Sequence, residues 1–128
     1  EIIKETYLQL NNEGKAHSIE CFDKGKLVAG LYGVHIGSCF FGESMFNNMT
    51  NASKLTLLYL IALLANNKFT LLDSQFYNPH LLQFGAYEIN DDEYQQYLHK
   101  GINKQISFPQ ELNFQKSVSI LQSLSQRS

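Results

Sequence analysis

The chain has 128 residues, 44% of them hydrophobic and 17% charged, which is the size and composition of one globular domain with a single core. A formal net charge of −2 provides no basic footprint for wrapping a nucleic-acid backbone, and no apolar run is long enough to span a bilayer. The cysteines, Cys21 and Cys39, lie on apparent strands without zinc-site spacing, so we expect buried, reduced thiols in a cytosolic protein.

The first third of the chain is predicted to be a helix followed by a β-meander. Residues 2–10 carry apolar side chains at helical spacing, and the polar run that ends at Gly14 stops this pattern. Three stretches then show the alternation and the turn residues of antiparallel strands, namely residues 17–22, 27–37 and 39–46. The chain opens on Glu1, already inside the helical pattern and without an initiator Met, which suggests that something upstream is missing.

The rest of the chain alternates helices and strands. A helix is expected to begin at the capping-type residues Asn51 and Ser53 and to end at Asn66. The elements expected after it are a buried strand over 69–75, a short helix over 80–84, a strand over 86–89, a helix capped by Asn90 that ends near Gly101, and a tail over 114–128 that is either a docked amphipathic helix or a frayed end. The sum is an α+β fold, with one largely antiparallel sheet flanked by helices.

A carboxylate within an apolar strand is the first candidate for chemistry. Glu43 lies in the segment CFFGESMF (residues 39–46), directly after Gly42, whose missing Cβ lets a backbone or a ligand approach closely. A buried carboxylate needs a cationic partner or has a raised pKa, whereas a Glu on a sheet rim simply points outward to water. Because Glu is rarely fully buried, the residues alone favour the outward position.

A second acidic candidate ends the predicted strand over 69–75. Strand geometry places Asp73 and Gln75 on the same face, although this pairing is also common in turns. The four His are scattered without the spacing of a metal site, and no Cys–His or Ser–His nucleophile unit stands out, so we expect no metal. The residues by themselves therefore predict an acid-lined site on a sheet.

Five segments, taken together, resemble the leucyl/phenylalanyl-tRNA–protein transferase family. They are GLYGVHIGSCFFGESMF (30–46), MTNASK (49–54), LLDSQ (71–75), PHLLQFGAYEI (79–89) and YQQYL (94–98). The resemblance runs in correct order from Gly14 to Pro109. It implies an enzyme that moves Leu or Phe from aminoacyl-tRNA to the N-terminal Arg or Lys of a protein and so creates an N-degron for proteolysis.

The resemblance also implies a GNAT-like acyltransferase fold over residues 1–128 and a cytoplasmic location. The sequence lacks the pyrophosphate-binding loop of acetyl-CoA users, so no cofactor is expected. The implied partners are the 3′ end of aminoacyl-tRNA and a protein or peptide with N-terminal Arg or Lys, with no membrane. The family's N-terminal domain, which stacks aromatic side chains on the terminal adenosine of the tRNA, is expected to be absent from this chain, which has no Trp.

Carried over residue by residue, the resemblance assigns catalytic roles to Glu43, Asp73 and Gln75. Gln75 would accept an N–H of the attacking amine, Asp73 would polarise Gln75, and Glu43 would hold a cationic group of a substrate. The pocket that selects the donor side chain matches seven positions, which are Leu31, Phe40, Gly42, Leu57, Leu60, Leu64 and Leu72. Apolar residues at such spacing usually only pack in the hydrophobic core. They can both pack in the core and line the pocket if the pocket lies between the helix and the sheet.

Two other functions stay open. One is a GNAT-type N-acetyltransferase with a divergent cofactor loop, against which the missing loop argues. The other is a non-catalytic module that binds a basic peptide N-terminus, against which the joint presence of Glu43, Asp73 and Gln75 argues.

Overall fold

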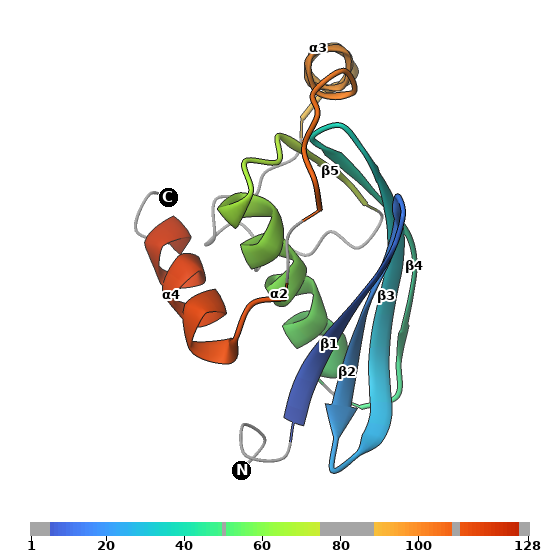
Figure 1. Cartoon of the computed structure of the whole chain (residues 1–128), viewed down its shortest axis with the longest axis vertical. Helices are drawn as coiled ribbons and strands as arrows, with labels where there is room; N and C mark the ends of the chain where they lie inside the picture. The colour runs from blue at the N-terminus through green and yellow to red at the C-terminus, as the bar shows by residue number, and fades with distance from the viewer. Residues whose placement is uncertain (1–5, 50, 75–88, 109–110, 126–128) are drawn as a thin grey trace.

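The computed structural model describes residues 6–49, 51–74, 89–108 and 111–125. A five-stranded sheet in the order β1-β2-β3-β4-β5 forms one layer (Figure 1). The helix α2 (Ala52–Asn66) lies against one face of this sheet, and α4 (Phe114–Ser125) packs on the far side of α2. The helix α3 (Asp91–Gly101) lies at one end of the molecule, near β5. The predicted α+β class, with a largely antiparallel sheet flanked by helices, is confirmed.

Four of the strands form an antiparallel meander: β1 (Thr6–Glu13), β2 (Ala16–Asp23), β3 (Lys26–Ile36) and β4 (Cys39–Asn47). The three turns between them each contain a glycine with positive φ, a conformation that glycine adopts without steric cost. The predicted meander over residues 17–46 is therefore confirmed. The last strand, β5 (Leu71–Asp73), pairs in parallel with β4 after the crossover through α2.

The helix predicted over residues 2–10 is wrong where the structure describes that stretch. From Tyr7 to Leu10 the side chains alternate between exposed and half-buried positions, and Leu8 and Leu10 pack against the core. This segment pairs along its whole length with β2, so strand pairing overrides the helical spacing of its apolar residues. Residues 1–5 lie outside the described residues.

The core lies between α2 and the sheet. It contains a cluster of buried side chains, which are Ile19, Leu31, Phe40, Leu57, Tyr59, Leu60, Leu63 and Leu64. The helix α2 is buried on more than the single face that its leucine spacing predicted, because α4 covers its other side. Cys21 and Cys39 are buried and unpaired, as predicted.

The buried hydroxyl of Tyr59 ties the start of α4 to α2. It donates a hydrogen bond of 2.7 Å to the carbonyl of Leu112 and accepts one of 2.8 Å from the amide of the same residue. The side chain of Asn113 then accepts from the amide of Lys116 and caps α4. A polar atom in the core is thereby satisfied by the segment that it anchors.

The helix α3 begins and ends as its sequence predicts. The Asn90 side chain accepts a hydrogen bond of 2.9 Å from the amide of Glu93, and the helix ends at Gly101. A Cβ on Gly101 would lie 2.5 Å from Cys39 Sγ and 2.9 Å from Ser38 Oγ, so glycine is required for this close packing. The helix predicted over 80–84 and nearly all of the strand predicted over 86–89 lie outside the described residues.

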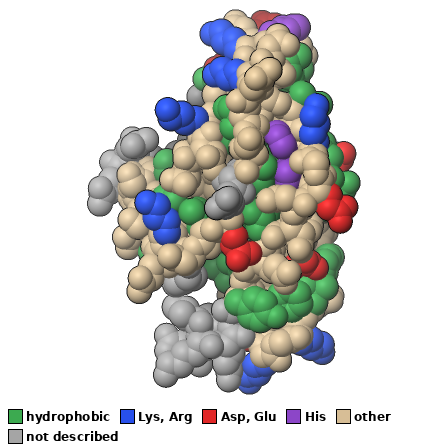
Figure 2. Space-filling model, viewed as in Figure 1, with side chains coloured by type: hydrophobic (Ala, Val, Ile, Leu, Met, Phe, Trp, Pro, Cys, Tyr) green, Lys and Arg blue, Asp and Glu red, His purple; other side chains and the backbone are tan. Residues whose placement is uncertain are grey.

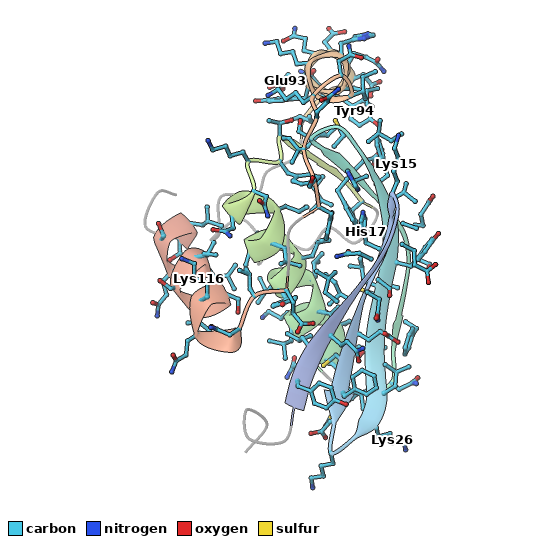
Figure 3. All side chains as sticks on the ribbon, viewed as in Figure 1. Lys15, His17, Lys26, Glu93, Tyr94 and Lys116 are labelled. Carbon is cyan, nitrogen blue, oxygen red and sulfur yellow. The ribbon has the colours of Figure 1, made fainter. Side chains whose placement is uncertain are left out.

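Two histidines form a buried pair beneath Phe108 (Figure 3 labels His17). Nε2 of His17 lies 2.5 Å from Nδ1 of His35, and Nδ1 of His17 lies 2.7 Å from Oδ1 of Asn12. The ring of Phe108 stacks on His17 with 3.8 Å between centroids. Burial, and after it the neighbouring His35, lowers the pKa of His17 to about 4, and burial lowers that of His35 as well.

The His pair predicts an acid-sensitive fold. A His with a pKa near 6.5 in the unfolded chain and about 4 in the folded chain takes up its proton preferentially on unfolding. The free energy of unfolding should therefore fall as the pH drops from about 6.5 towards 4, by up to ~1.4 kcal/mol per pH unit for one such proton. Urea unfolding monitored across this range measures the slope.

The matched variants are His17→Gln and, as a control on the exposed face of α3, His99→Gln. The slope should shrink in His17→Gln and stay unchanged in His99→Gln. An equal slope in all three proteins would show that other groups cause the acid sensitivity.

Candidate active site

The candidate site lies where β4 and β5 meet. Their parallel pairing is three residue pairs long and joins Cys39 to Leu71, Phe40 to Leu72 and Phe41 to Asp73. Successive side chains of a strand point to opposite faces of its sheet. Leu72 packs against the buried cluster under α2, so Asp73 projects from the opposite face. The adjacent residues Leu72 and Asp73 thus place an apolar side chain on one face of β5 and a carboxylate on the other.

Asp73 is half-buried and is held by a residue from α3. The hydroxyl of Tyr94 donates a hydrogen bond of 2.6 Å to Oδ2 of Asp73. This hydrogen bond, with partial burial as a second cause, raises the pKa of Tyr94 to about 12. Tyr94 therefore remains a hydrogen-bond donor throughout the physiological pH range.

Glu43 is an extra residue in β4. Tyr32 of β3 pairs with Ser44 and the next residue, Gly33, pairs with Gly42, so the register passes over Glu43. This is a β-bulge, which reverses the alternation of side chains along the strand. Phe40 before the bulge and Met45 after it consequently both pack on the core, while Glu43 is exposed. The bulge explains how a carboxylate is placed within an apolar strand without being buried.

The strands approach closely beside this bulge. Gly33, which pairs with the half-buried Gly42, lies under the ring of Phe40. A Cβ on Gly33 would lie 2.5 Å from the carbonyl oxygen of Phe41 and 2.6 Å from that ring. Glycine at this position of β3 is therefore needed for β4 to follow its path past Glu43.

The apolar residues predicted to select the donor side chain come together in the structure. Leu31, Phe40, Leu57, Leu60 and Leu64 are each at most 6% exposed and belong to one buried cluster. Leu72 and Phe108 pack against the same cluster. These side chains lie on the α2 face of the sheet, whereas Asp73 projects from the opposite face at the end of β5.

The three predicted catalytic residues are only partly described. Gln75 lies outside the described residues. Phe41, which pairs with Asp73, precedes Glu43 by two residues, so strand geometry puts the α-carbons of Glu43 and Asp73 roughly 8 Å apart. The convergence of all three side chains stays a prediction.

Sequence reasoning missed Tyr94 and the His pair. Tyr94 is the first residue of the segment YQQYL and lies in the first turn of a capped helix. This fixed position was the only indication in the sequence that Tyr94 could have a structural or functional role. Its contact with Asp73 joins residues 21 apart in the chain, which no spacing rule predicts. The pairing of His17 with His35 likewise depends on the register of β2 with β3.

Other kinds of site find little support among the described residues. They contain no group of three or more His, Cys, Asp or Glu side chains that could hold a metal ion. Burial raises the pKa of both cysteine thiols, which favours the unreactive protonated form. In the parts of the chain that the structure describes, no helix is long and apolar enough to cross a membrane.

A distant likeness links the chain to a solved structure. The ribosomal-protein-alanine N-acetyltransferase from Brucella melitensis biovar Abortus 2308 is 11% identical, with a TM-score of 0.46 over 80% of this chain and 72% of that one.

Similarity in sequence is much closer. A leucyl/phenylalanyl-tRNA–protein transferase from Hyphomonas neptunium is 53% identical over 88 residues, which make up 69% of this chain and 34% of the relative. One from Akkermansia muciniphila is 47% identical over 103 residues, 80% of this chain and 53% of the relative. The chain thus matches about half the length of such relatives, or less. Because residues 1–99 also match the family described as leucyl/phenylalanyl-tRNA protein transferase, the chain belongs to that family.

Proposed function

We propose that this chain forms the acyl-transfer half of an enzyme that moves Leu or Phe from aminoacyl-tRNA to the α-amine of a protein with N-terminal Arg or Lys. The observation that carries the proposal is the adjacency of Leu72 and Asp73 on β5. Leu72 belongs with the apolar cluster that would select the donor, and Asp73 supplies a fixed carboxylate at the same strand end, on the opposite face of the sheet. The product would carry a new N-terminal residue that marks it for proteolysis in the cytoplasm.

The reaction is the aminolysis of an ester. The acceptor's α-amine attacks the aminoacyl carbonyl, a C–N bond forms, and the bond to the 3′ oxygen of the terminal adenosine breaks. The proton lost by the amine ends on that oxygen or on water. An α-amine has an unperturbed pKa of about 7.7–8.0, so a useful fraction is already neutral near pH 7. The site therefore has to orient the amine rather than deprotonate it strongly.

The polar residues divide this task. The carbonyl oxygen of Gln75 would accept an N–H of the amine, and Asp73 would accept from the Gln75 amide and make that oxygen more negative. Phe41 and Asp73 are paired in the sheet. In the sequence, Glu43 lies two residues after Phe41, and Gln75 lies two residues after Asp73. An exposed carboxylate at the Glu43 bulge would then hold the basic side chain of the acceptor.

The body of the tRNA requires contacts beyond those that this chain offers on the face seen in Figure 2. Lys and Arg side chains are spread over that face rather than gathered in one basic patch. Since the matched relatives are about two to three times as long as the aligned segments, we propose that the remainder of such an enzyme supplies most of the tRNA contacts. Assays therefore use both this chain and the chain joined behind the N-terminal half of the Akkermansia relative.

Gln75→Ala should lower the turnover of leucyl transfer much more than it weakens the binding of either substrate. The proposed interaction strengthens as the amine loses its proton, and such an interaction appears in kcat rather than in ground-state affinity. The measurement is transfer of labelled Leu from its tRNA to an Arg-started peptide, with saturation curves for both substrates. Gln95→Ala, an exposed glutamine on α3, is the matched control. Wild-type turnover in Gln75→Ala would mean that the proton moves without the Asp–Gln pair.

Glu43→Gln should chiefly raise the KM for Arg-started peptides. The loss of a charge-assisted hydrogen bond of ~1.5–3 kcal/mol corresponds to roughly ten- to more than a hundredfold. A peptide that starts with norleucine, which lacks the basic group, should show no such change. Glu13→Gln, on exposed β1, serves as the control protein. An equal rise in KM for both peptides would place Glu43 away from the acceptor's side chain.

Donor selection should be coarse among large apolar side chains. A methylene or two in an apolar pocket changes transition-state binding by only ~1–3 kcal/mol, so Leu, Phe and Met should differ modestly in kcat/KM while Ala is transferred far more slowly. Competition among these donors on the same tRNA body measures the ratios. Equal transfer of Ala and Leu would contradict a pocket built from the leucine cluster.

A further inference from the structure

We propose that Tyr94 is a positioning residue for the transfer reaction, because its hydroxyl fixes the orientation of the Asp73 carboxylate. The inference rests on the proposed function and adds to it a residue on a separate helix. An ionised carboxylate accepts hydrogen bonds and cannot donate them, so the phenol must be the donor in this contact. The distance of 2.6 Å is that of a short, charge-assisted O–H···O bond.

The hydrogen bond has a direct geometric consequence. A carboxylate at the end of a three-residue strand rotates about its side-chain bonds unless something holds it. Tyr94 occupies Oδ2 and so sets the plane of the carboxylate. The other oxygen, Oδ1, is then presented in a fixed direction, and it is the oxygen that would meet the Gln75 amide in the proposed mechanism.

Tyr94 can act as a fixed point because α3 is held at both ends. At its start, Asn90 caps the helix, and the Tyr94 amide donates to the Asn90 carbonyl. At its end, the carbonyl of Gly101 accepts a hydrogen bond of 3.0 Å from the amide of Ser38. The Ser38 carbonyl in turn accepts from the amide of Thr70, and the two side-chain hydroxyls lie 2.6 Å apart.

Through these contacts α3 supports β5 at both of its ends. Thr70 precedes β5 and Asp73 ends it, and α3 reaches both, the first through Ser38 and the second through Tyr94. Figure 3 shows Tyr94 on the side of α3 that faces the sheet. A group that must stay within a few tenths of an ångström of a productive geometry is best supported by such a rigid element.

Tyr94→Phe keeps the ring and removes only the hydroxyl. We expect the kcat of leucyl transfer to fall roughly tenfold or more, as for the loss of a hydrogen bond to a charged group, with little change in KM for peptide or tRNA. Tyr97→Phe is the matched control, because Tyr97 is also half-buried on α3 and lies one turn further along the helix. Wild-type kcat in Tyr94→Phe would overturn the inference.

A double-mutant cycle separates positioning from a purely structural tether. If Tyr94 acts through Asp73, the Tyr94→Phe change should have little further effect on kcat in an Asp73→Ala background. An equal loss of kcat in both backgrounds would show that Tyr94 only supports the fold and would overturn the inference.

An independent readout uses no activity. With ring-labelled tyrosines, the NMR signal of Tyr94 should not titrate up to about pH 11 in the wild type, since its pKa is about 12. In Asp73→Ala it should titrate at a clearly lower pH, closer to the ordinary value of a phenol near 10, because only partial burial and Cys39 then raise its pKa. The same titration midpoint in both proteins would overturn the inference. A wild-type protein that holds this bond yet transfers nothing would overturn the proposed function, and the inference with it.

Discussion

The parallel pairing of β4 with β5 is the constraint on which the candidate site depends. It is only three residues long, and α2 forms the crossover that makes it possible. The same helix buries the leucine cluster against the sheet, so the pairing and the core stabilise one another. Because the strand ends at Asp73, the pairing delivers a carboxylate to the border between the apolar core and the opposite face.

The neighbouring elements also help to fix the positions of the polar groups at this border. The β-bulge lets β4 carry Glu43 to an exposed position without disturbing Phe40 and Met45 on the core face. The helix α3 supports the β5 side through Tyr94 and Gly101. A rigid, mostly apolar scaffold with a few oriented polar groups is what an ester aminolysis requires, since orientation supplies much of its rate.

The sequence predicted the features that depend on local pattern. Alternating residues and glycine turns predicted the meander from residue 17 to 46, and Asn90 predicted the start of α3. It failed where tertiary pairing decides: residues 7–10 have helical spacing but pair with β2, since an open sheet edge gains more from a fourth antiparallel strand. The bulge at Glu43 and the Tyr94–Asp73 hydrogen bond depend on how separate elements pair and pack, so no local sequence motif predicts them. The residue pattern alone marked Glu43 and Asp73 as acidic candidates, whereas their catalytic roles came from the family resemblance.

A competition between two donors for one acceptor tests the proposed leucyl transfer most directly. An Arg-started peptide is incubated with leucyl-tRNA and acetyl-CoA together, with the protein joined to the relative's N-terminal half, and the peptide's N-terminus is read by mass spectrometry. If the protein transfers leucyl groups, one leucyl residue is added to the α-nitrogen, and none is added to a peptide whose α-amine is already blocked. An acetyl group on that nitrogen, or a peptide left unmodified, would contradict the proposed transfer.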